Sequence, residues 1–270
     1  MILGHQRQIE YLEQARKNGK LVHAYLLYGP QGVGKLAMAQ EFAKMLGAEV
    51  VLVDREHTLV SKKDERKEIP IEDIRELKRM WGFAAAGSAG WRSWRVLIIN
   101  DAEYMSDQAA NAFLKLLEEP GERTIIFLIA SSRDLLMPTI VSRTIPISFS
   151  LVPDQDLRAW CHSRASGNPE SITIDLLLTL AGGRPGVLFD LLEDRGTLAQ
   201  EEALLRDLEM CLMAGRAPEA FQVSARIAGD RETVERTLAQ LYGVLRRSLL
   251  GLVADNSYSP DFGRIKHLAR

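Results

Sequence analysis

A glycine-rich run that ends in a lysine is the segment of the sequence best suited to chemistry. Gly29, Gly34 and Lys35 follow the pattern G-x-x-x-x-G-K, and Gly32 lies within the run. Glycines in this arrangement let successive backbone N–H groups converge on phosphate oxygens, while the lysine reaches the terminal phosphates. The spacing therefore predicts a phosphate-binding loop, to which the positive end of a following helix adds attraction for nucleotide phosphates.

The groups that would hold magnesium beside such a loop are incomplete. Leu36 stands where a serine or threonine hydroxyl would bind the cation, and an alkyl group cannot ligate a hard metal ion. The acidic metal ligand and the catalytic base that would follow a later strand can be assigned to this sequence in two registers. Either the neutral Asn100 takes the metal position with Asp101 as the base, or Asp101 is the ligand and Ala102 takes the base position. One essential group is missing in both registers, so we expect no metal, no required cofactor and no efficient hydrolysis, with weak metal-free ATP binding left open.

Alternating apolar and amphipathic segments would position these groups. Apolar runs that predict strands lie at residues 22–28, 49–54, 96–99, 124–130 and 145–149. Helical patterns lie between them, near residues 6–18, 36–46, 70–81 and 107–117. Strands that are apolar throughout are typical of a parallel sheet covered by helices on both faces. The pattern predicts an α/β domain over residues 1–150, with a small-residue linker at 84–90.

The strand signal fades beyond residue 150, and helical patterns take its place. Residues 151–196 show short helical stretches that a loop-like segment near 163–169 interrupts, and residues 197–270 show three longer helical patterns. The sequence therefore predicts an α/β domain followed by two all-α domains, over 151–196 and 197–270.

The overall composition is that of an ordinary globular protein. Charged residues make up 26% of the chain, hydrophobic residues 46%, and the net charge is −2. This balance excludes a whole-chain basic field that would draw the protein onto nucleic acid or anionic lipid. Cys161 and Cys211 are too few for a disulfide framework or a structural zinc site, and no apolar run reaches the length of a membrane span. With no signal peptide visible, we expect a cytoplasmic protein without membrane association.

Taken in order, several segments resemble the bacterial clamp-loader branch of the AAA+ ATPases. The segments that carry the resemblance are Gly4–Gln6, His23–Lys35, Ile71–Leu77, Asn111–Pro120 and Pro138–Arg143. Together they cover most of residues 4–145. The resemblance implies an AAA+ P-loop domain over 1–150, a helical lid over 151–196, and a collar-type oligomerisation domain over 197–270 that ends early for a full collar.

The pair Ser142-Arg143 gains its meaning from this resemblance. In the family a Ser-Arg motif supplies an arginine finger to the ATP of a neighbouring subunit, and Arg143 takes that place here. A fixed guanidinium can stabilise charge that spreads over transferring phosphoryl oxygens, and it needs no magnesium in its own subunit. The resemblance implies a non-motor (stator) subunit of the DNA polymerase III clamp loader, an accessory part of a nucleotidyltransferase holoenzyme. The partners it implies are the gamma/tau and delta subunits and, through the complex, the sliding clamp and primer-template DNA.

Three features of the sequence depart from the family pattern. The sensor arginine of the lid falls at Gly186, although Arg184 lies close by. Many relatives carry a four-cysteine zinc module, but residues 47–70 contain no cysteine, so we expect no zinc. Thr144 replaces the cysteine that commonly follows the Ser-Arg motif.

Two other functions compete with the stator interpretation. A motor-type, gamma/tau-like clamp-loader ATPase or a repair helicase loader would need the hydroxyl that Leu36 lacks. A small-molecule kinase with a P-loop would need a basic acceptor-binding lid, and residues 154–196 show no such cluster.

Overall fold

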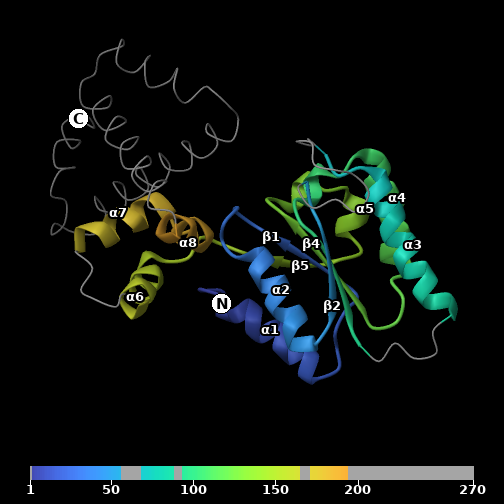
Figure 1. Cartoon of the computed structure of the whole chain (residues 1–270), viewed down its shortest axis with the longest axis horizontal. Coiled ribbons are helices and arrows are strands. Elements are labelled where there is room, and N and C mark those ends of the chain that lie inside the picture. The colour runs from blue at the N-terminus through green and yellow to red at the C-terminus, as the bar shows by residue number, and fades with distance from the viewer. Residues whose placement is uncertain (1, 56–67, 88–92, 165–170, 194–270) are drawn as a thin grey trace, which may run out of the picture. The chain divides into compact units, whose positions relative to one another are not determined.

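The computed structural model describes residues 2–55, 68–87, 93–164 and 171–193 (Figure 1). The chain divides into two compact units, of which the first ends at Ser150 and the second begins at Leu151. The first unit contains a parallel sheet between two sets of helices, and the described part of the second unit is helical. The predicted α/β class with a parallel sheet is confirmed.

Every strand pairing among the described residues is parallel. The strands are β1 (Ala24–Tyr28), β2 (Glu49–Val53), β3 (Arg95–Ile99), β4 (Thr124–Ala130) and β5 (Ile145–Ser148), in the spatial order β2-β3-β4-β1-β5. The register places Leu26 of β1 beside Leu128 of β4 and Pro146 of β5. Because the strands are parallel, the loops that leave them emerge at one edge, here called the carboxyl edge, and the opposite edge is the amino edge.

The structure describes five α-helices in the first unit, two of which have a recognisable capping residue at one end. They are α1 (Gln6–Lys17), α2 (Lys35–Leu46), α3 (Ile71–Gly87), α4 (Asp107–Glu118) and α5 (Pro138–Val141), with short 3₁₀ turns at Ala102–Tyr104 and Arg133–Leu135. Ser106 caps α4, since its Oγ accepts a hydrogen bond from the N–H of Ala109. Gly47 ends α2 at a φ of 61°.

The predicted linker at residues 84–90 is wrong for residues 84–87, which form the last turn of α3. The segment is rich in alanine, and alanine has the highest helix propensity of all residues. The rest of the predicted linker, residues 88–90, lies outside the described residues.

The two faces of the sheet are buried by different helices. Figure 1 shows α1 and α2 on one face and α3, α4 and α5 on the other. Leu26 and Phe113 of α4 belong to one continuous apolar cluster on the α3 and α4 face. On the opposite face, the rings of Tyr25 and Phe127 stack at 5.6 Å, and Phe42 of α2 meets Phe127 edge-on at 5.9 Å. Burial on both faces explains why the three central strands, β3, β4 and β1, are almost entirely apolar.

The described part of the second unit consists of α6 (Asp154–Arg164), α7 (Ser171–Ala181) and α8 (Pro185–Glu193). The rings of Trp160 and Phe189 pack at 4.8 Å between their centroids, which joins α6 to α8. Residues 194–270, which include the whole of the predicted collar-type domain, lie outside the described residues, so the predicted division at 196/197 stays a prediction. No helix in the described ranges is long and apolar enough to cross a membrane.

Candidate functional site

The loops that follow several strands meet at the carboxyl edge of the sheet. The glycine-rich run follows β1, Asn100 and Asp101 follow β3, and Ser131 follows β4. In open parallel sheets this is the edge at which ligands bind. The structure therefore brings the predicted phosphate-binding loop and the predicted acidic positions to the same edge.

The three glycines of the loop have backbone conformations that favour glycine. Gly29, Gly32 and Gly34 have φ values of 142°, 74° and 104°. At Gly29 a Cβ atom would lie 2.2 Å from the carbonyl oxygen of Phe149, so the loop packs directly on the segment after β5. At Gly34 a Cβ atom would meet nothing within 4 Å. The first glycine is thus required for packing, whereas the last lies beside open space at the start of α2.

The side chain of Lys35 is only 6% exposed and folds back onto its own loop. Its Nζ donates hydrogen bonds to the carbonyl oxygens of Gly29 and Pro30, the latter at 2.7 Å. Burial lowers the pKa of Lys35 to about 8, while the negative charges of Glu103 and Asp101 act against that decrease. The ammonium group that would reach nucleotide phosphates is therefore engaged by the loop itself.

The positions expected to hold magnesium do not fit that ion. Leu36 lies in the first turn of α2, and Asn100 follows β3 with its N–H bonded to the carbonyl of Val53 at 2.9 Å. Asp101 has a φ of 55° and forms an ion pair with Arg55 at 3.7 Å between Oδ2 and Nη2. Burial raises the pKa of Asp101, and the positive charge of Arg55 opposes the increase. In the described ranges, no three His, Cys, Asp or Glu side chains are grouped so that they could hold a metal ion.

Two charged residues at the carboxyl edge were missed by the sequence reasoning. The guanidinium carbon of Arg55 lies 4.1 Å from the centre of the Tyr104 ring, a cation–π contact. Glu103 accepts hydrogen bonds from the N–H of Ser131, at 2.9 Å, and from its hydroxyl, and so joins the segment after β3 to the end of β4. The sequence signal that could have pointed to Glu103 is its acidic side chain two positions after Asp101. Its partner, Ser131, becomes evident only once β3 and β4 are known to be neighbouring strands.

His5 supports the loop from the start of the chain. It has a φ of 59° at the beginning of α1, and its Nε2–H donates to the carbonyl oxygen of Val33 at 3.1 Å. Its ring packs 4.6 Å from that of Phe149. Burial is the main cause that lowers the pKa of His5. His5 therefore joins the loop to the segment after β5.

Arg143 lies at the other edge of the sheet. It precedes β5, in which Ile145 pairs with Tyr25 near the start of β1. Gly29 lies four residues after Tyr25, which places it about 13 Å from Tyr25 at ~3.3 Å per residue of a strand. The predicted arginine finger and the predicted phosphate-binding loop of this chain are therefore not brought together within the subunit.

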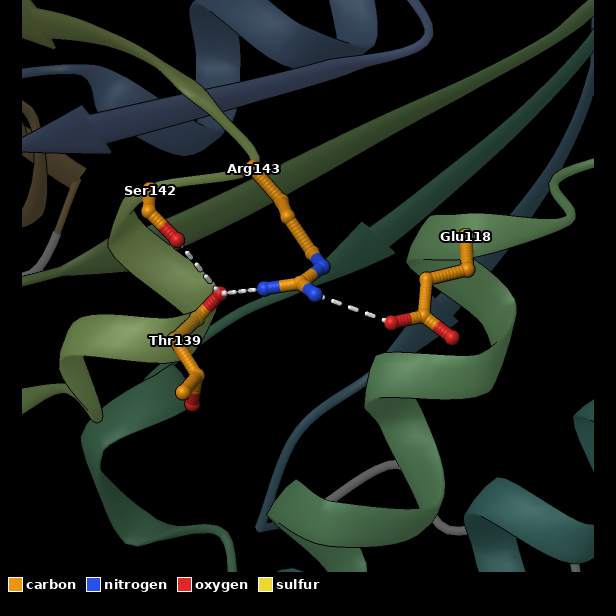
Figure 2. Close-up of polar contacts among 4 residues, drawn as sticks. All are labelled: Glu118, Thr139, Ser142 and Arg143. Carbon is orange, nitrogen blue, oxygen red and sulfur yellow. Dashed lines mark hydrogen bonds and ion pairs between the residues drawn. The ribbon is translucent and has the colours of Figure 1, made fainter.

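Arg143 is 39% exposed and is held by two contacts (Figure 2). Its Nη1 donates to the carbonyl oxygen of Thr139, and its Nη2 donates to Oε1 of Glu118, both at 3.0 Å. The hydroxyl of Ser142 donates to the same carbonyl of Thr139 at 3.0 Å. Thr144, at the position of the family's cysteine, is buried and bonds its hydroxyl to a carbonyl of α5. Ser142 thus secures the end of α5, while Arg143 presents its guanidinium at the surface.

Arg184, the alternative to Gly186 as a lid sensor, lies in the turn between α7 and α8. Its Nε donates to the carbonyl oxygen of Ala181 at 3.1 Å, and burial lowers its pKa. Gly186 itself lies in the first turn of α8. Within the second unit, Arg184 therefore has a local role in ending α7.

Residues 4–153 match the family described as DNA polymerase III, delta subunit, which covers more than half of the chain. The chain belongs to this family. The matched region contains the glycine-rich loop, the segment after β3 and the Ser-Arg pair.

Individual relatives point in the same direction. DNA polymerase III subunit delta' of Pseudomonas aeruginosa is 31% identical over 181 residues, which cover 60% of this chain and 53% of that protein. DNA polymerase III subunit gamma/tau of Mycobacterium tuberculosis is 27% identical over 205 residues, covering 68% of this chain and 34% of the relative. Replication factor C small subunit 2 of Pyrobaculum arsenaticum is 27% identical over 254 residues, which cover 94% of this chain and 67% of that protein. The chain spans about half of the delta' relative and about a third of the gamma/tau relative.

The fold is also similar to that of a solved motor protein. RuvB of Thermotoga maritima, a Holliday junction branch migration motor, superposes with a TM-score of 0.51 at 16% identity, over 86% of this chain and 72% of that one. At this identity the likeness concerns the fold alone, and it supports the AAA+ fold expected from the sequence.

Proposed function

We propose that this chain is a stator subunit of the delta' type in a bacterial DNA polymerase III clamp loader. In this role it donates Arg143 to the ATP of a neighbouring gamma/tau subunit and hydrolyses no ATP itself. With the delta subunit it helps the complex to place the sliding clamp on primer-template DNA during replication in the cytoplasm.

The location of Arg143 carries this proposal. The guanidinium is exposed at the end of α5 and lies about a strand length from the phosphate-binding loop of its own chain. Arginine suits the stabilisation of a phosphoryl group because it is always charged and presents a planar fork of donors. A finger that is out of reach of its own loop can serve only a nucleotide in another subunit.

The state of the loop supports a stator rather than a motor. Lys35 is buried on the carbonyl oxygens of Gly29 and Pro30, Leu36 offers no metal ligand, and Asp101 is paired with Arg55. A nucleotide would have to displace these internal contacts before binding, and no hydroxyl would then complete the magnesium shell. We therefore infer weak nucleotide binding at most, and no hydrolysis of consequence, at this loop.

Copurification followed by ATPase assays tests the proposal. The chain is mixed with the gamma/tau and delta subunits of its own organism, and Mg·ATP turnover is measured for the chain alone and for the mixture with primed DNA and clamp. We expect a stable complex, negligible turnover by the chain alone, and DNA-stimulated turnover by the mixture. Lys35→Ala in this chain should leave the turnover of the mixture unchanged within about twofold.

The alternative function is a motor-type clamp-loader subunit. The 27% identity to gamma/tau proteins and the presence of Lys35 favour this alternative. It predicts magnesium-dependent turnover by the isolated chain that Lys35→Ala abolishes. That result, or failure of the chain to enter the complex, would overturn the stator proposal.

A further inference from the structure

We propose that Glu118 is a positioning residue for Arg143, which holds the guanidinium at the surface in the orientation that a neighbouring subunit's ATP requires. The inference rests on the proposed function and extends it to a residue outside the Ser-Arg pair. Figure 2 shows Glu118 at the end of α4, facing Arg143 across from Thr139.

The guanidinium of Arg143 can bind a phosphate while Thr139 and Glu118 hold it in place. A guanidinium has five N–H donors. In the described part of the chain, Arg143 uses one donor of Nη1 on the Thr139 carbonyl and one of Nη2 on Glu118. The three remaining donors include Nε–H and are sufficient for a two-point contact with phosphate oxygens. Glu118 therefore does not have to leave when the finger engages.

Glu118 and Arg143 lie at the ends of two helices that pack against each other. Glu118 is the last residue of α4, and α5 begins at Pro138, whose ring fixes its φ. The two helices pack together through the apolar cluster that contains Phe113 and Ile140. A long arginine side chain loses considerable rotamer freedom when it is ordered, so prior ordering by Glu118 removes part of that cost from the catalytic step.

Stability does not explain why a carboxylate stands at this position. The last turn of a helix carries the negative end of the helix dipole, so an acidic residue there is unfavourable. The Glu118–Arg143 pair is also exposed, with side-chain exposures of 52% and 39%, and exposed ion pairs contribute little to folding. The arrangement is therefore better explained by the function of Arg143 than by the folding of α4.

The test uses the clamp-loader complex reconstituted with the full chain and its gamma/tau and delta partners. Glu118→Ala should lower the DNA-stimulated kcat for Mg·ATP by roughly three- to tenfold, the scale expected for lost ordering of one long side chain. The KM for ATP and the melting temperature of the isolated chain should not change. Glu118→Gln, which keeps an acceptor oxygen, should restore part of the loss. Glu119→Ala removes the adjacent exposed glutamate and is the matched control, for which we expect wild-type turnover.

A double-mutant cycle with Arg143→Ala separates the two proposals. If Glu118 acts through Arg143, adding Glu118→Ala to Arg143→Ala causes no further loss. A further loss in that background, or Glu118→Ala turnover equal to that of Glu119→Ala while Arg143→Ala is impaired, would refute the positioning role alone. Normal turnover of Arg143→Ala itself would refute the proposed function, and with it this inference.

Discussion

The buried ammonium group of Lys35 should titrate far below an ordinary lysine. Its pKa falls from 10.5 to about 8, and the side chain is 6% exposed, so solvent screening requires no large discount. Each pKa unit corresponds to about 1.4 kcal/mol, so the folded protein disfavours the charged form by about 3 kcal/mol relative to the unfolded chain. The substitution Lys35→Met isolates this free-energy cost, because methionine keeps an unbranched apolar side chain but has no titratable group.

The sign of the pH dependence follows from proton counting. Between pH 8 and 10.5 the unfolded chain holds the Lys35 proton while the folded chain has lost it, so the contribution of Lys35 to stability rises with pH across this window. Urea unfolding of both proteins at several pH values gives the difference in free energy, in which the other titrating groups cancel. Relative to Lys35→Met, the wild type should gain about 3 kcal/mol between pH 7.5 and 10.5.

Carbon-detected NMR of the lysine Cε atoms provides the direct check. One resonance that is absent from Lys35→Met should shift with a midpoint near pH 8. A midpoint above pH 10, together with a flat stability difference, would refute the burial of this ammonium on the loop carbonyls.

Three further predictions test the site and its supports. Gly29→Ala should destabilise the protein by at least about 2 kcal/mol more than Gly34→Ala in urea unfolding, because both positions have a positive φ but only the first Cβ would clash, at 2.2 Å from Phe149 O. Ser106→Ala should cost about 1 kcal/mol in the same assay, because it removes the side-chain cap of α4. Leu36→Thr should give the isolated chain no magnesium-dependent ATP turnover, because Asp101 stays paired with Arg55 and the loop still engages Lys35.

Each of these expectations has a result that contradicts it. Equal stability of the two glycine variants would mean that the loop does not pack on the segment after β5. A Ser106→Ala protein as stable as the wild type would mean that the cap contributes nothing to α4. If ATP turnover by the Leu36→Thr protein rises with magnesium concentration, the missing hydroxyl alone explains why the wild-type loop does not hydrolyse ATP.

Much of the first unit could be predicted because its signals are local. Apolar runs without alternation indicate strands buried on both faces, and all five predicted runs overlap the observed strands. The cap at Ser106 and the end of α2 at Gly47 depend on residues within one helical turn. The exception is α3, which continues through residues 84–87 because alanine propensity outweighed the glycines around it.

The contacts that define the site could not be predicted, because they join distant segments. Glu103 meets Ser131 only because β3 and β4 are neighbours, and Arg143 meets Glu118 across 25 residues because α4 and α5 pack together. The loop pattern around Lys35 correctly indicated where the loop lies. It gave no sign that the lysine would turn back onto Gly29 and Pro30.

The most direct test of the central claim is the ATP turnover of the reconstituted clamp loader with Arg143→Ala as its only change. If Arg143 serves a neighbour's nucleotide, DNA-stimulated turnover should fall by roughly 10³-fold at that interface, the scale of arginine fingers in related enzymes, while the complex still assembles. Lys35→Ala in the same chain should leave turnover near the wild-type value. Unchanged turnover by an intact Arg143→Ala complex would contradict the account.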